Sequence, residues 1–343
     1  MSQLEKYSKE FREKAIGNGF SSDEIQKCLI YAIPILEKNL PVIYNTSHLS
    51  SLVGYNKKYL KRASGYSRFF YKEHIIKKRN GKTRTLNEPL PSLKEIQSWI
   101  KDNILEKIPI SRYAKAYSSG RSIKDHVKFH KGYKFVLTLD IEDFFGSIDL
   151  EVVEKIFLKS GYSKLISNLL AKICTYENSL PQGAPSSPTI SNIVLNPLDN
   201  TISEYCRLKG IRYTRYADDL AFSGDNMNEI ELIHLISKSL RDISKLKLNT
   251  EKTMLMKNNE RQVISGIIVN EKIQIPRKKR DELRQAMYYI DKFGLEDHLQ
   301  WIKCTKSNYI KHLLGIANYI NFINPNDKEA KEIMSKLHKM IKN

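Results

Sequence analysis

Residues 212–223 read RYTRYADDLAFS, and two adjacent aspartates, Asp218 and Asp219, interrupt a run of tyrosine, leucine, alanine and phenylalanine. The flanking residues alternate as in β-strands, which predicts a tight hairpin with Ala217 and Asp218 at its tip. Two carboxylates about 5 Å apart repel by roughly 3 kcal/mol at an effective dielectric near 20. We therefore expect a positive charge to lie between them.

A third aspartate, Asp140, ends the apolar segment FVLTLD, which is typical of a buried strand. If that strand and the hairpin are neighbours in one sheet, three carboxylates meet at strand ends. Such a site suits Mg²⁺, which prefers oxygen ligands and retains several waters. Two ions about 3.5 to 4 Å apart would activate a hydroxyl and stabilise a pyrophosphate leaving group. This pattern predicts nucleotidyl transfer catalysed by Asp140, Asp218 and Asp219; a solvated turn is the alternative for the Asp pair.

The composition indicates a folded protein with an anionic partner. The chain has 343 residues and is 41% hydrophobic, which allows a substantial core. Its formal charge is +19, from 57 Lys and Arg against 38 Asp and Glu. Such an excess suits a polyanion, with nucleic acid as the first expectation and an anionic membrane surface as the second.

Targeting and cysteine patterns favour a cytosolic location. No apolar run approaches the roughly 18 to 20 residues that span a bilayer, and the charged N-terminus does not resemble a signal peptide. We therefore expect no membrane partner. The cysteines, at positions 28, 174, 206 and 304, form no CxxC pair, which favours buried free thiols over a zinc site or disulfides.

The hydrophobic periodicity predicts an α+β fold with a helical beginning, a mixed middle and a helical end. The short β-like runs that follow Tyr66 form a hairpin around Asn80-Gly81, a strong turn signal. The pattern predicts helices over 1–65, 91–108, 151–161, 162–176, 189–210 (a single helix despite Pro197), 228–245 and from 276 onward with a break near Pro325, a strand at 134–145, a hairpin at 211–223 and a strand pair around 261–275.

Four motifs, in this order, are similar to those of bacterial reverse transcriptases, and most of all to retron reverse transcriptases. They are RNGKTRTLNEPLPSLKEIQ (79–97), LDIEDFF (139–145), LPQGAPSSP (180–188) and YADD (216–219). The similarity covers roughly residues 60–270. It implies a right-hand polymerase: an N-terminal helical region at 1–65, fingers and palm with an antiparallel sheet at 66–275, and an RNA-binding helical thumb at 276–343.

The resemblance implies a set of metal ligands. The family's ligands fall on Asp140, Asp218 and Asp219, and the backbone carbonyl of Ile141 would add another. The implied cofactor is a pair of Mg²⁺ ions, with Mn²⁺ as an alternative.

The resemblance also implies how the incoming dNTP is bound. Phe145 matches the ring that lies under the sugar and excludes a 2′-hydroxyl, which favours DNA synthesis, although a core ring beside Phe144 is the alternative. Lys252 matches a proton donor to pyrophosphate, with a surface lysine equally compatible. For Gln182 and Gly183 the alternative is a structural proline turn, and for Lys78 it is a solvated surface lysine. The full nucleotide-binding set is Lys78, Arg84, Phe145, Gln182, Gly183 and Lys252.

A third set would contact RNA or the primer. The tail combines cationic and tyrosine side chains, as single-stranded RNA recognition favours, although tyrosine at helical spacing is also common in cores. The set comprises His130, Tyr216, Ser265, Gly266, Arg277, Lys278, Lys279 and Arg280.

The chain departs from the retron pattern in two places. Where the family has Asn-Ala-x-x-His, this chain keeps only His130, and where the family has Val-Thr-Gly, it has Ile264-Ser265-Gly266. These changes leave open a defence-associated reverse transcriptase outside the retrons. His126 and His130, four residues apart, would share a helix face, so zinc binding, RNA contact and core packing are alternatives for them.

The resemblance implies a bacterial enzyme that copies part of a cognate noncoding RNA into single-stranded DNA. In a retron, synthesis starts from a 2′-hydroxyl and leaves a branched RNA–DNA, and the complex restrains a separate effector protein in antiphage defence. The alternatives are a non-retron enzyme with protein priming or untemplated synthesis, and an RNA-binding scaffold that does not polymerise.

Overall fold

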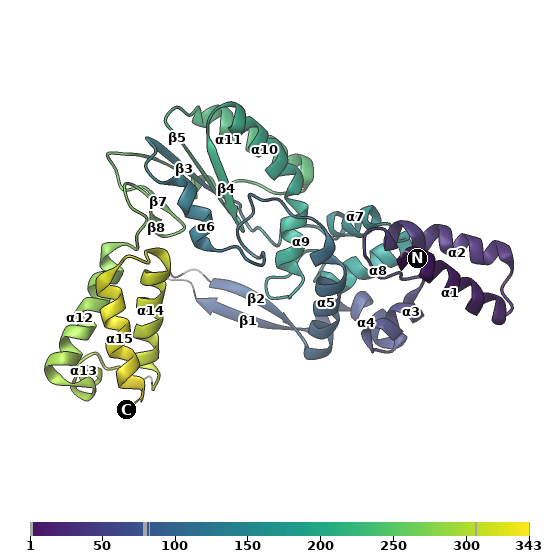
Figure 1. Ribbon diagram of the computed structural model, residues 1–343, viewed down its shortest axis with the longest axis horizontal. Coiled ribbons are helices and arrows are strands. Elements are labelled where there is room, and N and C mark those ends of the chain that lie inside the picture. Colours follow the sequence, from purple (N-terminus) through teal and green to yellow (C-terminus); the bar gives the residue numbers. More distant parts are fainter. Residues whose placement is uncertain (1–2, 78–80, 82, 306, 343) are drawn as a thin grey trace. The chain divides into compact units, whose positions relative to one another are not determined.

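The computed structural model describes residues 3–77, 81, 83–305 and 307–342 (Figure 1). The chain folds into two compact units, and each is assembled from three separate segments. The first unit contains Met1–Ser119, Ile141–Glu204 and Ile230–Asn249, and the second contains Gly120–Asp140, Tyr205–Glu229 and Thr250–Asn343. The division into three domains at 65 and 275 stays a prediction.

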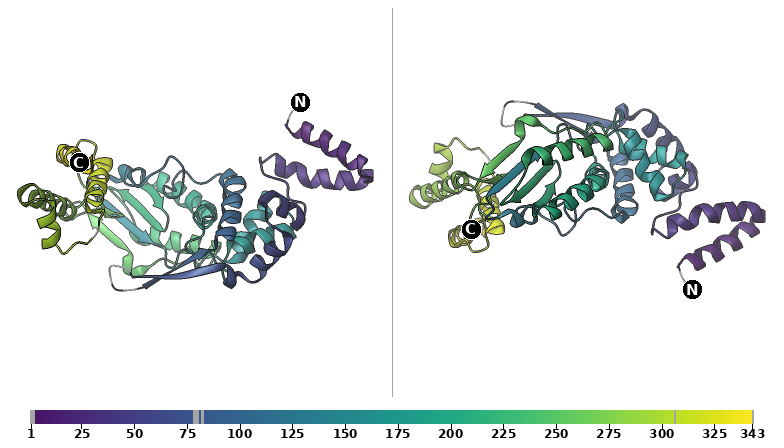
Figure 2. Two further views of the ribbon diagram at one scale, coloured as in Figure 1. Left: turned by 90° about the horizontal axis from the view of Figure 1, so that it is seen from below. Right: turned by 90° about the horizontal axis from the view of Figure 1, so that it is seen from above.

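The first unit begins with helices, as predicted for residues 1–65. Ser21 and Glu24 form a reciprocal capping box that starts α2, and Ile25 and Leu29 of α2 pack against Ala15 of α1. These two helices lie side by side in both views of Figure 2. The opening helices are α1 (Gln3–Gly17), α2 (Ser22–Leu36), α3 (Thr46–Val53) and α4 (Lys57–Gly65).

A β-hairpin and a group of helices complete the first unit. In the hairpin, Tyr71 pairs with Pro89 and Lys77 with Thr83, which confirms the predicted hairpin; of its turn, the structure describes Gly81. The buried Gln97 amide donates to the Tyr71 hydroxyl (2.7 Å) and to the Ile173 carbonyl (2.8 Å). The elements are η1 (Ser67–Phe70), β1 (Tyr71–Lys77), β2 (Thr83–Pro89), α5 (Pro91–Asn103), η2 (Leu105–Lys107), α7 (Leu150–Ser160), α8 (Lys164–Cys174) and α9 (Ser187–Val194), with α10 (Asn196–Leu208) and α11 (Glu229–Ile243) lying largely in this unit.

The second unit is built on an antiparallel sheet with strand order β4-β5-β3-β6. Central strand β3 is apolar because it is covered on both faces: Val136, Leu137 and Leu139 are all buried. The predicted pairing of this strand with the acidic hairpin is confirmed. Its elements are α6 (Ile123–Val127), η3 (Lys128–His130), β3 (Phe135–Asp140), β4 (Arg212–Tyr216), β5 (Asp219–Gly224), η4 (Thr250–Lys252), β6 (Met254–Lys257), β7 (Val263–Ile264) and β8 (Ile267–Ile268).

The second unit ends in helices, as predicted beyond residue 276. One apolar cluster joins these helices to the sheet, since Val136 and Ala221 of the strands belong to it together with Leu283, Leu313 and Leu337. The helices are α12 (Arg277–Phe293), α13 (Leu295–Trp301), α14 (Tyr309–Ile323) and α15 (Lys328–Lys342).

Two predictions of local structure were wrong. The single helix expected over 189–210 is divided at Leu195 into α9 and α10, because Pro197 lacks an N–H and fits only the first turn of a helix. The strand pair around 261–275 is reduced to the two-residue strands β7 and β8, and β6 was not predicted.

The structure also bears on the predictions about membrane-spanning helices and cysteines. In the part of the chain that the structure describes, no helix has the length and apolarity to cross a membrane. All four cysteines are free; Cys174 and Cys206 are buried, whereas Cys28 and Cys304 are partly exposed. Burial was therefore predicted correctly for two of them.

Candidate active site

The acidic residues lie at one end of the four-stranded sheet, where β3 ends and β4 turns into β5. Tyr216 pairs with Asp219, so Ala217 and Asp218 form the two-residue turn of the β4–β5 hairpin. Ala217 has a left-handed backbone with φ of 57°. On the next strand, Asp140 pairs directly with Asp219, which places these two side chains on one face. The predicted meeting of the three carboxylates at strand ends is confirmed.

A positive charge does accompany the acids, but it contacts a different carboxylate from the one expected. The Lys252 Nζ lies 2.9 Å from Oδ1 and 2.8 Å from Oδ2 of Asp140. From the sequence, a cation was expected between Asp218 and Asp219. The hydrogen bonds of Lys252 go to Asp140 instead, although its charge also acts to lower the pKa of Asp218 and of Asp219.

Ser265 contacts the acidic end as well. Its Oγ donates to Oδ2 of Asp219 at 2.9 Å. Ser265 and Gly266 have φ of 45° and 81° and connect β7 to β8, as in a hairpin turn with two left-handed residues. The residues predicted to lie near the primer therefore include one that hydrogen-bonds to a carboxylate predicted to be catalytic.

The electrostatics of the cluster favour an added cation. Burial, together with the neighbouring charge of Asp219, raises the pKa of Asp218 to about 6. Burial also raises the pKa of Asp219, while the Ser265 hydrogen bond opposes this. The hydrogen bond to Asp140 raises the pKa of Lys252. A nearby cation favours the ionised form of a carboxylate, so it would offset the free-energy cost of burying these charges.

The donor set has the chemistry that a hard divalent cation requires, namely carboxylate oxygens at converging strand ends. Across residues 3–77, 81, 83–305 and 307–342, however, no three His, Cys, Asp or Glu side chains are arranged to hold a metal ion. Asp140 is occupied by Lys252, and Asp219 by Ser265. Metal binding by these residues thus requires Lys252 to release Asp140. Ile141 is buried and forms an isolated bridge with Leu248.

A buried polar network lies behind the hairpin and corrects the role of His130. Its Nδ1 hydrogen-bonds with Ser223 Oγ (2.8 Å) and its Nε2 with Thr214 Oγ1 (2.7 Å). Thr214 also donates to the carbonyl of His126 at 2.9 Å. His126 and His130 are both 0% exposed. Neither can contact RNA directly, and of the three alternatives for this pair core packing is the one observed.

The histidine network predicts a pH dependence of stability. Burial, aided by the charge of Arg212, lowers the pKa of His130 from 6.5 to about 3. Below pH 6.5 the imidazole of His130 is therefore protonated in the unfolded chain but stays neutral in the folded chain. The folded state loses stability as the pH falls from 6.5 toward 3. Between pH 7 and pH 5 this residue contributes a loss of about 2 kcal/mol.

Urea unfolding at pH 7 and at pH 5, compared between the wild type and His130→Gln, measures this contribution. The variant is expected to be less stable at pH 7 but to lose less stability on acidification. Equal losses in both proteins would contradict the assignment of a neutral buried imidazole.

One residue beside the acidic tip, Arg215, was not predicted to support the site. Arg215 is 0% exposed, and its Nη1 donates to the carbonyl of Ala217 at 3.1 Å, so it fixes the turn that carries Asp218. Strand alternation, with Tyr213 and Arg215 on one face, was the available signal. Tyr216, predicted to contact the primer, is partly buried, with its ring 5.7 Å from that of His126.

In the first unit, the predicted triphosphate and template residues contact one another. Arg84 Nε donates to Oε1 of Gln182 at 2.7 Å, and the Asn87 N–H donates to the Gln182 carbonyl at 2.8 Å. Gly183 has φ of 133°, and a Cβ there would lie 2.6 Å from the Asn87 carbonyl oxygen. Only glycine permits this approach of two backbones. Lys78 lies outside the described residues.

The two adjacent phenylalanines divide as one buried and one accessible ring. Phe144 is 5% exposed, whereas Phe145 is partly exposed, with ring centroids 5.2 Å apart. Phe144 therefore takes the core position, which leaves Phe145 accessible to a ligand.

Two of the predicted thumb residues form ion pairs within the protein: Arg277 Nε lies 3.3 Å from Oδ2 of Asp281 within α12, and Arg280 joins two helices. Arg280 Nη2 lies 2.8 Å from Oδ2 of Asp327 and 3.3 Å from Oε2 of Glu329, which ties α12 to the start of α15. The expected RNA contact of Arg280 stays a prediction, because its side chain is ion-paired but partly exposed. The other three are exposed in the first turn of α12: Arg277, Lys278 and Lys279.

The chain is similar in sequence to known reverse transcriptases. A family model described as reverse transcriptase (RNA-dependent DNA polymerase) matches residues 76–281. The chain is 31% identical over 306 residues to the retron Ec86 reverse transcriptase of Escherichia coli, covering 88% of this chain and 91% of that protein. It is 30% identical over 277 residues to the retron Mx65 reverse transcriptase of Myxococcus xanthus, covering 76% and 62%. A solved telomerase from Candida albicans, in complex with a fragment of telomeric RNA, aligns with a TM-score of 0.46 at 12% identity, covering 79% of this chain and 63% of that one.

Proposed function

The chain belongs to the reverse transcriptases and is an RNA-directed DNA polymerase, and from this premise we propose that it makes retron DNA from a dedicated noncoding RNA. The observation that carries the catalytic part of the proposal is the register that sets Asp140 opposite Asp219 beside the Asp218 turn. An RNA template and a DNA product follow from the family. What we propose beyond the family is the identity of the metal, the priming chemistry and the protein partner.

Reverse transcriptases use divalent metal ions, and we assign Mg²⁺ to the acidic end of the sheet. Asp140, Asp218 and Asp219 would hold two ions, with the Ile141 carbonyl as a further ligand and Mn²⁺ as a substitute. When bound, such ions supply Lewis-acid stabilisation of the phosphoryl group and lower the pKa of the attacking hydroxyl. Lys252 moves from Asp140 toward the pyrophosphate, to which it gives a proton.

The remaining residues position the substrates. Ser265 fixes the orientation of Asp219, and Arg215 holds the turn. Phe145 lies under the incoming sugar and excludes a 2′-hydroxyl by its bulk. Arg84, with its planar donor fork, binds the triphosphate together with Lys78. Gln182 and Gly183 support the template, and the exposed basic turn of α12 binds RNA phosphates.

At the level of biology, we propose a bacterial cytoplasmic enzyme of antiphage defence. It copies part of its cognate RNA from a 2′-hydroxyl primer into a branched RNA–DNA, and the complex restrains a separate effector protein. Support comes from the retron reverse transcriptases among its relatives, since the alignment with the retron Ec86 enzyme covers most of both chains. The departures at His126 and Ser265 from the retron pattern favour, as a second candidate, a defence enzyme with different priming.

The test is to purify the protein from its native host, sequence the bound nucleic acid and treat it with a debranching enzyme. The proposal expects one recurrent RNA, joined to DNA through a branch that debranching releases. Unbranched or untemplated DNA would contradict the retron proposal and support the second candidate, a defence enzyme with different priming. The paired variant Asp218→Asn/Asp219→Asn is the control, and it should retain the RNA but contain no DNA; unchanged biological activity of this variant would indicate a scaffold.

A further inference from the structure

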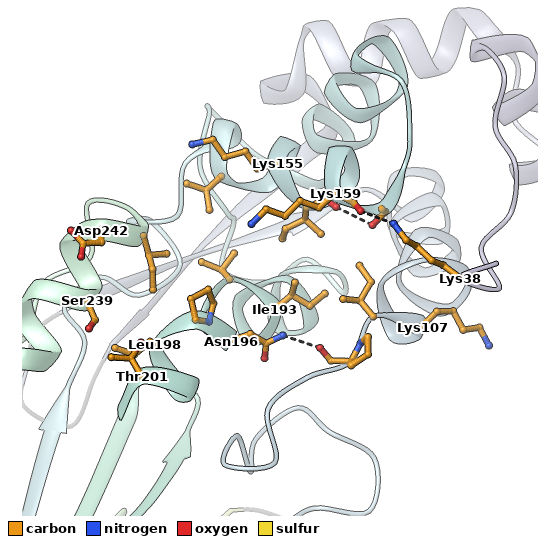
Figure 3. Close-up of a pocket in the computed structure, with 18 of the residues that line it drawn as sticks. Lys38, Lys107, Lys155, Lys159, Ile193, Asn196, Leu198, Thr201, Ser239 and Asp242 are labelled. Atoms are coloured by element: carbon orange, nitrogen blue, oxygen red, sulfur yellow. Dashed lines mark hydrogen bonds between the residues drawn. The ribbon is translucent and has the colours of Figure 1, made fainter. Parts of the chain in front are cut away.

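A large pocket in the first unit plays no part in the proposed chemistry. Its volume is about 770 Å³, within the range of ligand-binding cavities. Helix α7 forms one wall, the junction of α9 and α10 forms the floor, and the end of α11 closes one side (Figure 3). Every residue that lines it belongs to the first unit, whereas the acidic cluster belongs to the second.

The interior of the pocket is aliphatic. Val152, Ile193 and Ile243 are partly exposed along its walls, and no aromatic side chain among the described residues lines it. Nucleic-acid bases bind proteins largely by stacking on aromatic or guanidinium planes, which this surface does not offer. A segment that inserts apolar side chains fits the surface better.

Three neutral polar side chains of the pocket, those of Ser160, Asn196 and Ser239, are already hydrogen-bonded within the protein. Ser160 Oγ donates to the Ile156 carbonyl (2.9 Å), and Ser239 Oγ to the Leu235 carbonyl (2.9 Å). Asn196 Nδ2 donates to a backbone carbonyl at 2.8 Å, and its Oδ1 accepts a backbone N–H at 2.8 Å. Small-molecule sites usually direct a few free polar groups at the ligand. These residues direct theirs at the protein itself, which argues against a small polar ligand.

The rim carries a concentrated positive charge. Lys38, Lys107, Lys155 and Lys159 line the pocket, and Asp242 is the one acid among its described lining residues. Lys107, Lys155 and Lys159 are exposed, and within the described residues none of the three forms an ion pair. Lys155 and Lys159 are four apart on α7, so they project from the same face of the helix, as Figure 3 shows.

We propose that this pocket docks an acidic amphipathic segment of a partner protein. The apolar face of the segment fills the aliphatic interior, as in helix-in-groove recognition, and its carboxylates pair with Lys155 and Lys159. Complementary charge sets the orientation and speeds association. The inference rests on the pocket alone and holds whichever priming chemistry the polymerase uses.

A defined probe tests the proposal on the full-length protein by fluorescence anisotropy. The probe is a labelled synthetic helix with leucines at i, i+3, i+4 and i+7 and glutamates on the flanks. We expect saturable binding that weakens with added salt. Lys155→Glu/Lys159→Glu should weaken it by at least about tenfold, because each pair becomes a like-charge contact. The same double variant should bind a charge-reversed probe, with lysine in place of glutamate, more tightly than the wild type does.

A matched control separates docking from attraction to a basic protein. Lys57→Glu/Lys58→Glu changes the charge equally at exposed lysines of α4 in the same unit, outside the pocket, and should bind the acidic probe within about twofold of the wild type. Equal weakening by the two double variants would overturn the proposal. Undiminished binding of a probe whose leucines are replaced by serine would also overturn it. So would binding of oligoadenylate or of phosphatidylglycerol vesicles that depends on Lys155 and Lys159, if binding of the peptide does not. Primer extension within about twofold of the wild type verifies that each variant is folded.

Discussion

Asp140→Ala is expected to reduce primer extension on the order of a thousandfold, the upper end of what one group aimed at transition-state charge contributes. Asp140 closes the central strand and faces Asp219 across the sheet, so its loss removes a ligand that the other carboxylates cannot replace. The substitution also leaves Lys252 without its partner, which adds an unbalanced positive charge where the metals would bind. RNA affinity should stay within about tenfold, because phosphate contacts elsewhere dominate it.

The measurements are single-turnover extension of an annealed primer and filter binding of the RNA. Asp225→Ala is the matched control: this aspartate follows the opposite end of β5 in the same unit, where it accepts the Lys134 N–H at 3.1 Å. It should extend primers within about twofold of the wild type. A parallel fall of extension, RNA binding and melting temperature in Asp140→Ala would make the residue structural.

Gly183→Ala is expected to destabilise the protein by about 3 kcal/mol, through backbone strain at positive φ and a forced contact. The added Cβ would lie 2.6 Å from the Asn87 carbonyl oxygen, and that backbone cannot withdraw without breaking the hydrogen bond from the Asn87 N–H to Gln182. Because Arg84 also binds Gln182, displacing this loop should reduce polymerisation as well.

Urea unfolding compares this variant with Gly54→Ala, which has φ of 75° and no atom within 4 Å of an added Cβ. The control pays the backbone strain alone, about 1 kcal/mol. Equal destabilisation of the two variants would show that the close approach at Gly183 is not rigid.

The parts of the fold that the sequence predicted correctly are those with strong local signals. The alternation around Asp218 and the apolar run before Asp140 predicted a hairpin, a strand and their pairing. Apolar spacing predicted most of the helices. The division at Leu195 was missed because the apolar periodicity continues through Pro197, and β6 was missed because an edge strand of four residues carries little pattern.

In the candidate site, the acidic residues were predicted and their partners were not. The contacts of Lys252 with Asp140 and of Ser265 with Asp219 join residues far apart in the chain, which no local pattern reports. His130 was misjudged for the same reason, since its polar side chain looks available in the sequence but is buried and hydrogen-bonded inside the fold. The ion pair of Arg280 with Asp327 was likewise not predicted.

The central claim is that the carboxylates of Asp140, Asp218 and Asp219 gather divalent cations, and iron-directed cleavage tests it most directly. Fe²⁺ with ascorbate in place of Mg²⁺ generates radicals that cut the backbone next to the bound ion. The account predicts cuts near residues 140 and 218 that excess Mg²⁺ suppresses and that Asp219→Asn weakens. Cleavage elsewhere in the chain, or cuts at these positions that neither Mg²⁺ nor the substitution reduces, would contradict it.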